Sequence, residues 1–303
     1  MQAGLDGTPA DAAVRPGSAT SAVLVATDAR GRTLRLPGPA QRIVSLAPHV
    51  TELVFAAGAG DRLVAVAQWS DFPQAARKLP PIGGAGRLDV ERIHALAPDL
   101  IIGWQSGDPA ADVALLESLG HRVFQTESRR LADIAPLLRE IGRLAGTAPI
   151  AEREAIRMEQ ALTALRRDPG TRPTLFYQIW DSPLMTVSDR HFIGDAIALC
   201  GARNVFGSLP GLTPTVSTEA VLNVDPQLIV ASGTGDPRAL SGWQRFGHLR
   251  AVETGRLYQI DPDLLHRPTP RIVEGVRALC SAVERAGRVG RATSGARLGN
   301  GAG

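Results

Sequence analysis

The stretch DVERIHALAPDLIIGWQSGDP (residues 89–109) decides the fold, because STEAVLNVDPQLIVASGTGDP (residues 217–237) repeats its pattern. The two stretches align without a gap over 21 positions at a constant offset of 128 residues, so Glu91 corresponds to Glu219. Each copy holds a short helical segment, a proline turn and an apolar strand. Convergence of such common units could produce part of the match, but its ungapped length favours duplication of one α/β unit.

Outward from both copies, short apolar strands alternate with helices. In the first half we expect strands at 42–47, 63–67, 100–104 and 123–125, with helices at 51–57, 90–96 and 113–119. In the second half we expect strands at 174–179, 228–231 and 257–260, with helices at 193–200, 219–223 and 271–288. This alternation predicts an α/β fold with parallel sheets.

One long helix interrupts the alternation. Residues 148–167 are rich in helix formers, with Thr147 as a cap and Pro149 in the first turn. The predicted division is therefore an N-terminal lobe (22–146), a connecting helix (147–168) and a C-terminal lobe (171–288). Residues 1–21 lack the apolar segment of a secretory signal, and they and residues 289–303 are rich in small residues. We expect a disordered leader and a flexible tail there.

Composition and motifs argue against several classes of protein. The 303 residues carry a formal net charge of +3 and no Lys/Arg block, which argues against nucleic-acid binding. The sequence contains no run of about 18 apolar residues, so it predicts no membrane span. Enzyme signatures such as G-x-S-x-G, the Walker loop and H-E-x-x-H are missing, and the six histidines show no paired ligand spacing. We therefore predict no catalytic residue and no metal site.

The two cysteines, Cys200 and Cys280, leave two interpretations open. Two cysteines eighty residues apart cannot supply the four ligands of a structural zinc site. They can be two buried thiols, or they can form one disulfide in an oxidising compartment.

A set of segments between residues 42 and 285 carries a family resemblance. They are RIVSLAP (42–48) with Thr51-Glu52-Leu53, WSDFP (69–73), ERI (91–93), PDLIIGW (98–104), LCG (199–201), NVF (204–206) and RPTPRI (267–272) leading to Cys280. As a set they resemble the periplasmic substrate-binding proteins of the helical-backbone type, which serve importers of cobalamin, haem and ferric siderophores. Within that family the segments are most similar to the cobalamin-binding members.

The resemblance implies an architecture and a partner. It implies two Rossmann-like α/β lobes joined by one long rigid helix, with the ligand in a cleft between lobes that move little. It also implies a Cys200–Cys280 disulfide, because both cysteines fall where the family has one. The expected protein is a periplasmic monomer that delivers its ligand to the permease dimer of an ABC importer.

The same resemblance implies the ligand-contacting residues. Trp69 and Trp104 match positions with aromatic side chains in the cleft, Met185 falls where the cobalamin binders have an aromatic, and Asp263 and Arg267 match polar positions near the ligand. Other family aromatics fall at Ala85, near Thr213 and at Leu264 in this sequence. Trp180 is the candidate to compensate for these losses.

His266 stands where the family has an acidic residue. A histidine there could ligate iron, which would favour haem as the ligand. The identity of the metal chelate therefore stays open among cobalamin, haem and a ferric siderophore.

Glu91 and Glu219, equivalent in the repeat, match the family's docking glutamates. One carboxylate on each lobe can engage arginines of the two permease subunits. The alternative is that each merely offsets the dipole at a helix N-terminus. A third class of function, an enzyme on a nitrogenase-like two-lobe fold, would need cluster-ligating cysteines.

Overall fold

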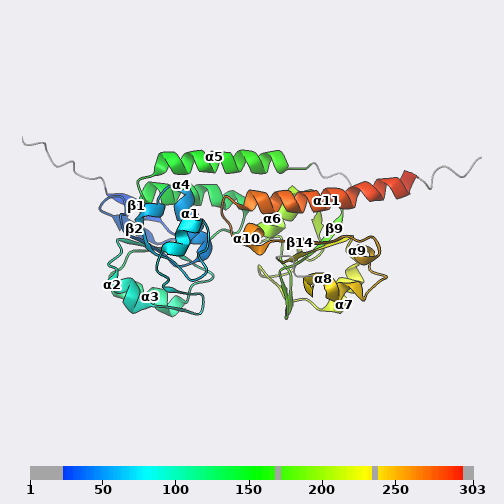
Figure 1. Cartoon of the computed structure of the whole chain (residues 1–303), viewed down its shortest axis with the longest axis horizontal. Helices are drawn as coiled ribbons and strands as arrows, with labels where there is room; N and C mark the ends of the chain where they lie inside the picture. Colours follow the sequence, from blue (N-terminus) through cyan, green and yellow to red (C-terminus); the bar gives the residue numbers. More distant parts are fainter. Residues whose placement is uncertain (1–22, 168–171, 234–237, 296–303) are drawn as a thin grey trace, which may run out of the picture.

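The computed structural model describes residues 23–167, 172–233 and 238–295, which form two α/β lobes side by side (Figure 1). The leader expected at residues 1–21 lies outside this range. The final helix, α11 (Ile272–Gly295), runs beyond residue 288, where the sequence pattern placed its end. No proline interrupts residues 289–295, so backbone hydrogen bonding can continue there. None of the described helices is both long enough and apolar enough to span a membrane.

A four-stranded parallel sheet forms the centre of the N-terminal lobe. Its strand order is β4 (Leu63–Ala65), β3 (Ile43–Ser45), β7 (Leu100–Trp104) and β8 (Val123–Thr126). All four coincide with strands expected from the apolar runs. The remaining strands of this lobe are two small antiparallel hairpins, β1 (Leu24–Thr27) with β2 (Thr33–Leu36), and β5 (Gly83–Gly84) with β6 (Arg87–Leu88).

The C-terminal lobe repeats the sheet. Its order is β12 (Arg203–Asn204), β9 (Thr174–Gln178), β13 (Leu228–Ser232) and β14 (Leu257–Ile260), again all parallel. Ile101 of β7 pairs with Val123, and Ile229 of β13 pairs with Leu257. Since β7 and β13 start and end at the offset of 128 residues, the repeated stretches form equivalent strands in the two sheets.

The helices before the repeated strands also match. Helix α2 (Val90–Ala95) and helix α7 (Thr218–Val224) both start one residue after a side-chain cap. Asp89 accepts a hydrogen bond from the Arg92 amide at 3.0 Å, and Ser217 accepts one from the Ala220 amide at 3.1 Å. These bonds satisfy amides that the helix itself leaves free.

Strand alternation splits the core into two layers in each lobe. In β7, Leu100 and Ile102 point into one large apolar cluster, whereas Ile101 between them belongs to a separate cluster under α2 and α3 (Ala110–Ser118). The large cluster continues through both lobes, which are covered on this side by α1 (Pro48–Ala56), α4 (Ile134–Leu144), α5 (Ala148–Leu165), α6 (Phe192–Leu199) and α11.

Helix α5 joins the lobes across the top of the molecule in Figure 1. It packs on α1 and α4 of the N-terminal lobe and on α11 of the C-terminal lobe. Its 18 residues correspond to a rod of about 27 Å. The fold is therefore the predicted pair of α/β lobes linked by one long helix.

The two cysteines of the sequence form a disulfide in the C-terminal lobe. Cys200, which follows α6, is bonded to Cys280 in α11, with 4.7 Å between their Cα atoms. The bond confirms the disulfide that the resemblance implied. The other described elements are η1 (Gly60–Arg62), η2 (Gln74–Lys78), η3 (Leu131–Asp133), β10 (Trp180–Asp181), β11 (Leu184–Met185), α8 (Arg238–Gln244), α9 (Arg250–Glu253) and α10 (Pro262–Leu265).

Candidate ligand-binding site

Two tryptophans, one on each lobe, are left open to solvent. Trp69 in the loop after β4 is 77% exposed, and Trp180 in β10 is 60% exposed. Trp69 also has a φ of 67°, which is rare for a large side chain. A folding core would bury indoles of this size. Both are therefore available to contact a flat apolar ligand.

Met185 lies beside Trp180. The two residues face each other across the antiparallel β10–β11 hairpin, so their side chains share one face. The hairpin brings together two residues that the sequence analysis named for separate reasons. The soft thioether and the indole form one apolar surface on the C-terminal lobe.

Trp104, at the end of β7, is half-buried and held from three sides. Its ring packs edge-on against His49 of α1, with ring centroids 5.0 Å apart. A Cβ added to Gly107 would lie 1.9 Å from the indole, so only glycine leaves room for the ring. The Trp104 amide donates to Asp108 Oδ2 at 2.6 Å. These contacts fix the direction in which the strand presents the ring.

Two titratable groups of this support have shifted pKa values. Burial raises the pKa of Asp108 to about 6, although bonds from Trp104 and Gln125 oppose the shift. Burial, aided by the charge of Arg267, lowers the pKa of His49 to about 4. His49 is therefore neutral at pH 7. The sequence offered a signal for Asp108, which lies in the repeated Gly-Asp-Pro, and none for the role of His49.

Arg267, expected near the ligand, is bound by three carboxylates. Its guanidinium lies 2.9 Å from Glu52, 2.8 Å from Asp71 and 2.9 Å from Asp263. Asp263 is the second predicted polar residue, so the structure does bring this pair together. Glu52 and Asp71 belong to the other lobe, which the sequence analysis did not foresee, although Glu52 stands in its Thr51-Glu52-Leu53 motif.

His266 is engaged inside the C-terminal lobe. Its Nε2 lies 3.0 Å from the hydroxyl of Tyr177, a fully buried residue of β9. Burial lowers the pKa of His266 to about 4. An iron atom at this nitrogen would have to displace the Tyr177 hydrogen bond. Among the described residues, no three His, Cys, Asp or Glu side chains gather as a metal site.

Glu91 and Glu219 are both exposed, each in the first turn of its capped helix. Hydrogen bonds from its own amide and from Ser217 lower the pKa of Glu219. In Figure 1, α2 and α7 lie at the bottom of the two lobes, on the side away from α5. The two carboxylates therefore project from corresponding places on the two lobes.

The structure also pairs two histidines that are 27 residues apart in sequence. His94 Nδ1 lies 3.0 Å from His121 Nε2. Sequence spacing could not show this contact, because α3 and the turn after it bring His121 back to α2.

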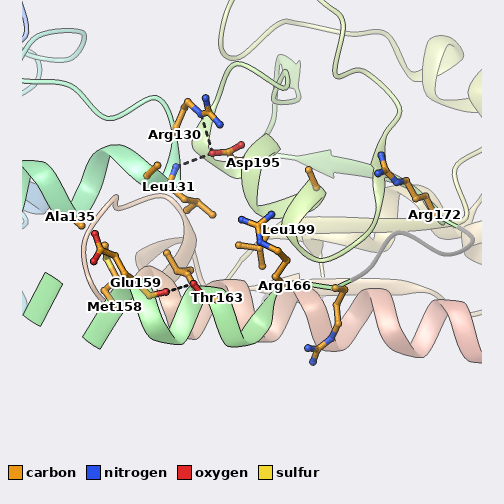
Figure 2. Close-up of a pocket in the computed structure, with 14 residues that line it drawn as sticks. Arg130, Leu131, Ala135, Met158, Glu159, Thr163, Arg166, Arg172, Asp195 and Leu199 are labelled. Atoms are coloured by element: carbon orange, nitrogen blue, oxygen red, sulfur yellow. Dashed lines mark hydrogen bonds and ion pairs between the residues drawn. The ribbon is translucent and has the colours of Figure 1, made fainter. Parts of the chain in front are cut away.

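A cavity of about 880 Å³ lies beside α5 (Figure 2), and no tryptophan lines it. Its floor is apolar, with Leu131, Met158 and Leu199, and arginines stand at its edge. One of them, Arg130, is 3.6 Å from Asp195. The cavity has none of the residues that the sequence analysis named as ligand contacts.

Two parallel α/β sheets linked by one helix, with exposed apolar side chains on both lobes, define a two-lobed binding protein. The chain belongs to the periplasmic binding protein family, whose model matches residues 43–264. This confirms the resemblance found in the sequence. Both cysteines of the chain are in the disulfide, so no thiol is free to hold the cluster of a nitrogenase-like enzyme.

Relatives of known name and solved structures support the assignment of the chain to this family. The vitamin B12-binding protein of Vibrio cholerae is 34% identical over 252 residues, covering 82% of this chain and 91% of that protein. The crystal structure of the periplasmic vitamin B12 binding protein of Vibrio cholerae matches with a TM-score of 0.74 and 32% identity, over 82% of this chain and 98% of that one. A periplasmic heme binding protein of Pseudomonas aeruginosa matches with a TM-score of 0.71 and 27% identity, over 80% of this chain and 92% of that one.

Proposed function

We propose that the protein captures cobalamin (vitamin B12), or a related corrinoid, between its lobes in the periplasm and delivers it to the permease dimer of an ABC importer. The observation that carries the proposal is the exposure of Trp69 on one lobe and of Trp180, paired with the half-buried Met185, on the other. Cobalamin is a broad disc with apolar faces, which flat indoles can cover. The named relatives point to the same ligand.

The first test is a titration of the purified protein with cyanocobalamin. Bound corrin should quench tryptophan fluorescence to saturation at one equivalent, and its visible spectrum should change little because no protein atom needs to ligate the cobalt. A protein that shows no quenching and retains no cobalamin in equilibrium dialysis would contradict the proposal.

Haem is the second candidate, supported by the similarity to the Pseudomonas aeruginosa protein. The Tyr177–His266 bond argues against it, because the buried Tyr177 hydroxyl would lose its partner if His266 Nε2 ligated iron. If haem binds through His266, added hemin should give a shifted Soret band that disappears in His266→Ala. We expect no such His266-dependent band.

Glu91 and Glu219 are proposed to dock the protein on the permease as a monomer, one carboxylate for each permease subunit. The double variant Glu91→Ala/Glu219→Ala should keep the cobalamin affinity of the parent and lose most uptake in a transport assay. Each single variant should lose less. The exposed Glu253 of α9 offers a control, since Glu253→Ala removes a surface carboxylate elsewhere. Normal uptake by the double variant would show that the two residues act only within their helices.

A further inference from the structure

A polar cluster joins the lobes at the centre of the molecule. Glu52 of α1 has a side chain only 2% exposed, and it accepts hydrogen bonds from three groups of the opposite lobe. These groups are Arg267 Nη1 at 2.9 Å, Thr269 Oγ1 at 3.0 Å and Arg271 Nη1 at 3.2 Å. One buried carboxylate of the N-terminal lobe thus binds the whole 267–271 segment of the C-terminal lobe.

The same segment returns to the loop that carries Trp69. Arg267 Nη1 also donates to Asp71 at 2.8 Å, and the Arg271 guanidinium lies 3.7 Å from the centre of the Phe72 ring. Both contacted residues follow Trp69 closely in the chain. The C-terminal lobe therefore holds one end of this N-terminal loop.

Ser70, between Trp69 and Asp71 in the same loop, is held from within its own lobe. Ser70 Oγ lies 2.9 Å from Thr51 Oγ1, which in turn lies 2.6 Å from Ser45 Oγ. Thr51 and Glu52 are consecutive in α1. Thr51 fixes Ser70 directly, and Glu52 fixes Asp71 through Arg267.

We propose that Glu52 is a positioning residue for ligand binding: by holding Arg267 and Arg271 it fixes the loop on which Trp69 is presented, so the C-terminal lobe sets the geometry of the N-terminal ligand contact. This inference rests on the proposed function in that it takes Trp69 as a ligand contact. Glu52 itself is buried in the cluster and acts through the arginines.

The charges of the cluster explain why the single residue Glu52 can affect the position of the Trp69 loop. Arg267 and Arg271 are balanced by Glu52, Asp71 and Asp263. Burial raises the pKa of Glu52, while its bonds to the arginines hold it down. Loss of the Glu52 charge would remove the carboxylate that Arg271 binds and leave Arg267 with the more exposed Asp71 and Asp263. Removing a partner from a buried charged network destabilises more than the loss of a surface pair. Arg271 is therefore expected to turn towards solvent, and the loop to be held less firmly.

Glu52→Gln, which keeps the size and removes the charge, tests this inference. Glu52→Gln should weaken cyanocobalamin binding about tenfold, as expected for the loss of one well-placed contact. If Glu52 acts through Trp69, the same change in the Trp69→Ala protein should weaken binding less than about twofold, since coupled residues are non-additive. An equal loss in both backgrounds, or no loss in the parent background, would overturn the proposal.

A ligand-free measurement separates this inference from the proposed function. Hydrogen exchange should be faster in peptides covering 66–79 and 264–272 of Glu52→Gln, and unchanged in peptides from α5. Glu159→Gln, which breaks an exposed 2.8 Å pair with Arg139, is the matched control and should change none of them. Unchanged exchange in Glu52→Gln refutes the positioning role whether or not the protein binds cobalamin.

Thr269→Val gives a second, milder variant in case Glu52→Gln does not fold. It removes one hydrogen bond to Glu52 and leaves every charge in place. A smaller increase in the exchange of the same two segments is expected. Faster exchange spread evenly over the N-terminal lobe would instead show a general loss of packing.

Discussion

The two lobes share one sheet design but are held together by different chemistry. Their strands have the same order, the repeated strands β7 and β13 lie 128 residues apart, and their first repeated helices have equivalent caps. The C-terminal lobe adds a disulfide and two half-buried neutral histidines, His191 and His266, where the N-terminal lobe has the buried neutral His49. The N-terminal lobe relies on packing and on the hydroxyl chain of Ser45, Thr51 and Ser70.

The difference shows which parts of a duplicated unit are free to change. The strands and caps of the repeated unit remain equivalent, whereas Trp69, Trp180 and Met185 lie outside the repeated stretches 89–109 and 217–237. Trp69 is in a loop, and Trp180 with Met185 is in a hairpin that the N-terminal lobe does not place after its corresponding strand, β3. The two sheets share one design, and the proposed ligand contacts Trp69 and Trp180 come from unlike segments of the two lobes.

The largest expected effect is loss of the disulfide, which should separate the stabilities of the two lobes. The bond closes a loop of 80 residues, so Cys200→Ala/Cys280→Ala should lower the free energy of unfolding by about 4 kcal/mol in the chain-entropy description. Urea unfolding followed by hydrogen exchange should show the C-terminal lobe opening first. An equal loss of protection in both lobes would mean that the connected core makes them one cooperative unit.

Mild acid should act on the same lobe by another route. Burial lowers the pKa of His191 and of His266 to about 4 from 6.5. Their neutral forms therefore favour the fold fully above pH 6.5, and this contribution is lost as the pH falls towards 4. For one such histidine the loss is roughly 2 kcal/mol at pH 5.

The N-terminal lobe should respond less to acid. The stabilising contribution of neutral His49 is lost in the same pH window. The pKa of Asp108 is raised from 3.8 to about 6, so its protonation favours the folded state as the pH falls through 6. Between pH 7 and pH 5, the free energy of unfolding should fall more for the C-terminal lobe than for the N-terminal lobe. His191→Gln should reduce this difference between the lobes. His248→Gln, at an exposed position, is the control. A steeper loss in the N-terminal lobe would contradict the comparison.

Replacing each exposed tryptophan compares the lobes as ligand surfaces. Trp69→Ala and Trp180→Ala should each weaken cobalamin binding by about 1–3 kcal/mol, with little change in folding stability because neither indole is buried. Binding constants from dialysis and unfolding curves of the same variants measure both quantities. Loss in only one variant would place the ligand on one lobe instead of between the two.

The smallest effect concerns the two equivalent caps. Asp89→Ala and Ser217→Ala should each cost about 1 kcal/mol of unfolding free energy, because each removes the acceptor for one helical amide. Asp89→Ser, which installs the cap of the other lobe, should restore most of the loss. If Asp89→Ser were as unstable as Asp89→Ala, the two caps would not be equivalent in energy.

Local patterns predicted most of the scaffold and missed parts of it. The apolar runs gave every strand of the two parallel sheets except the two-residue β12, and β7 and β14 were placed with correct bounds. Helix α4 was missed, although Ile134, Leu138 and Ile141 lie on one buried face with helical spacing. The short β10–β11 hairpin was also missed, because two-residue strands leave no periodicity to detect.

The candidate site divides in the same way. The resemblance named Trp69, Trp104 and Arg267, but not the groups that hold them. His49 supports Trp104, and Glu52 supports Arg267 from a position 215 residues away. Contacts of that separation depend on how α1 and the 267–271 segment meet between lobes, which no local pattern encodes.

The sequence by itself determined the alternation of strands and helices, the duplication and the connecting helix, because hydrophobic period and caps act over a few neighbouring residues. The tertiary structure alone decided which side chains remained exposed and which charges became buried. Trp69 is exposed and Glu52 is buried because of how the two lobes pack. Burial is therefore a property of the packed pair of lobes. Because of that packing, Glu52 of the short helix α1 binds residues 267, 269 and 271 of the opposite lobe.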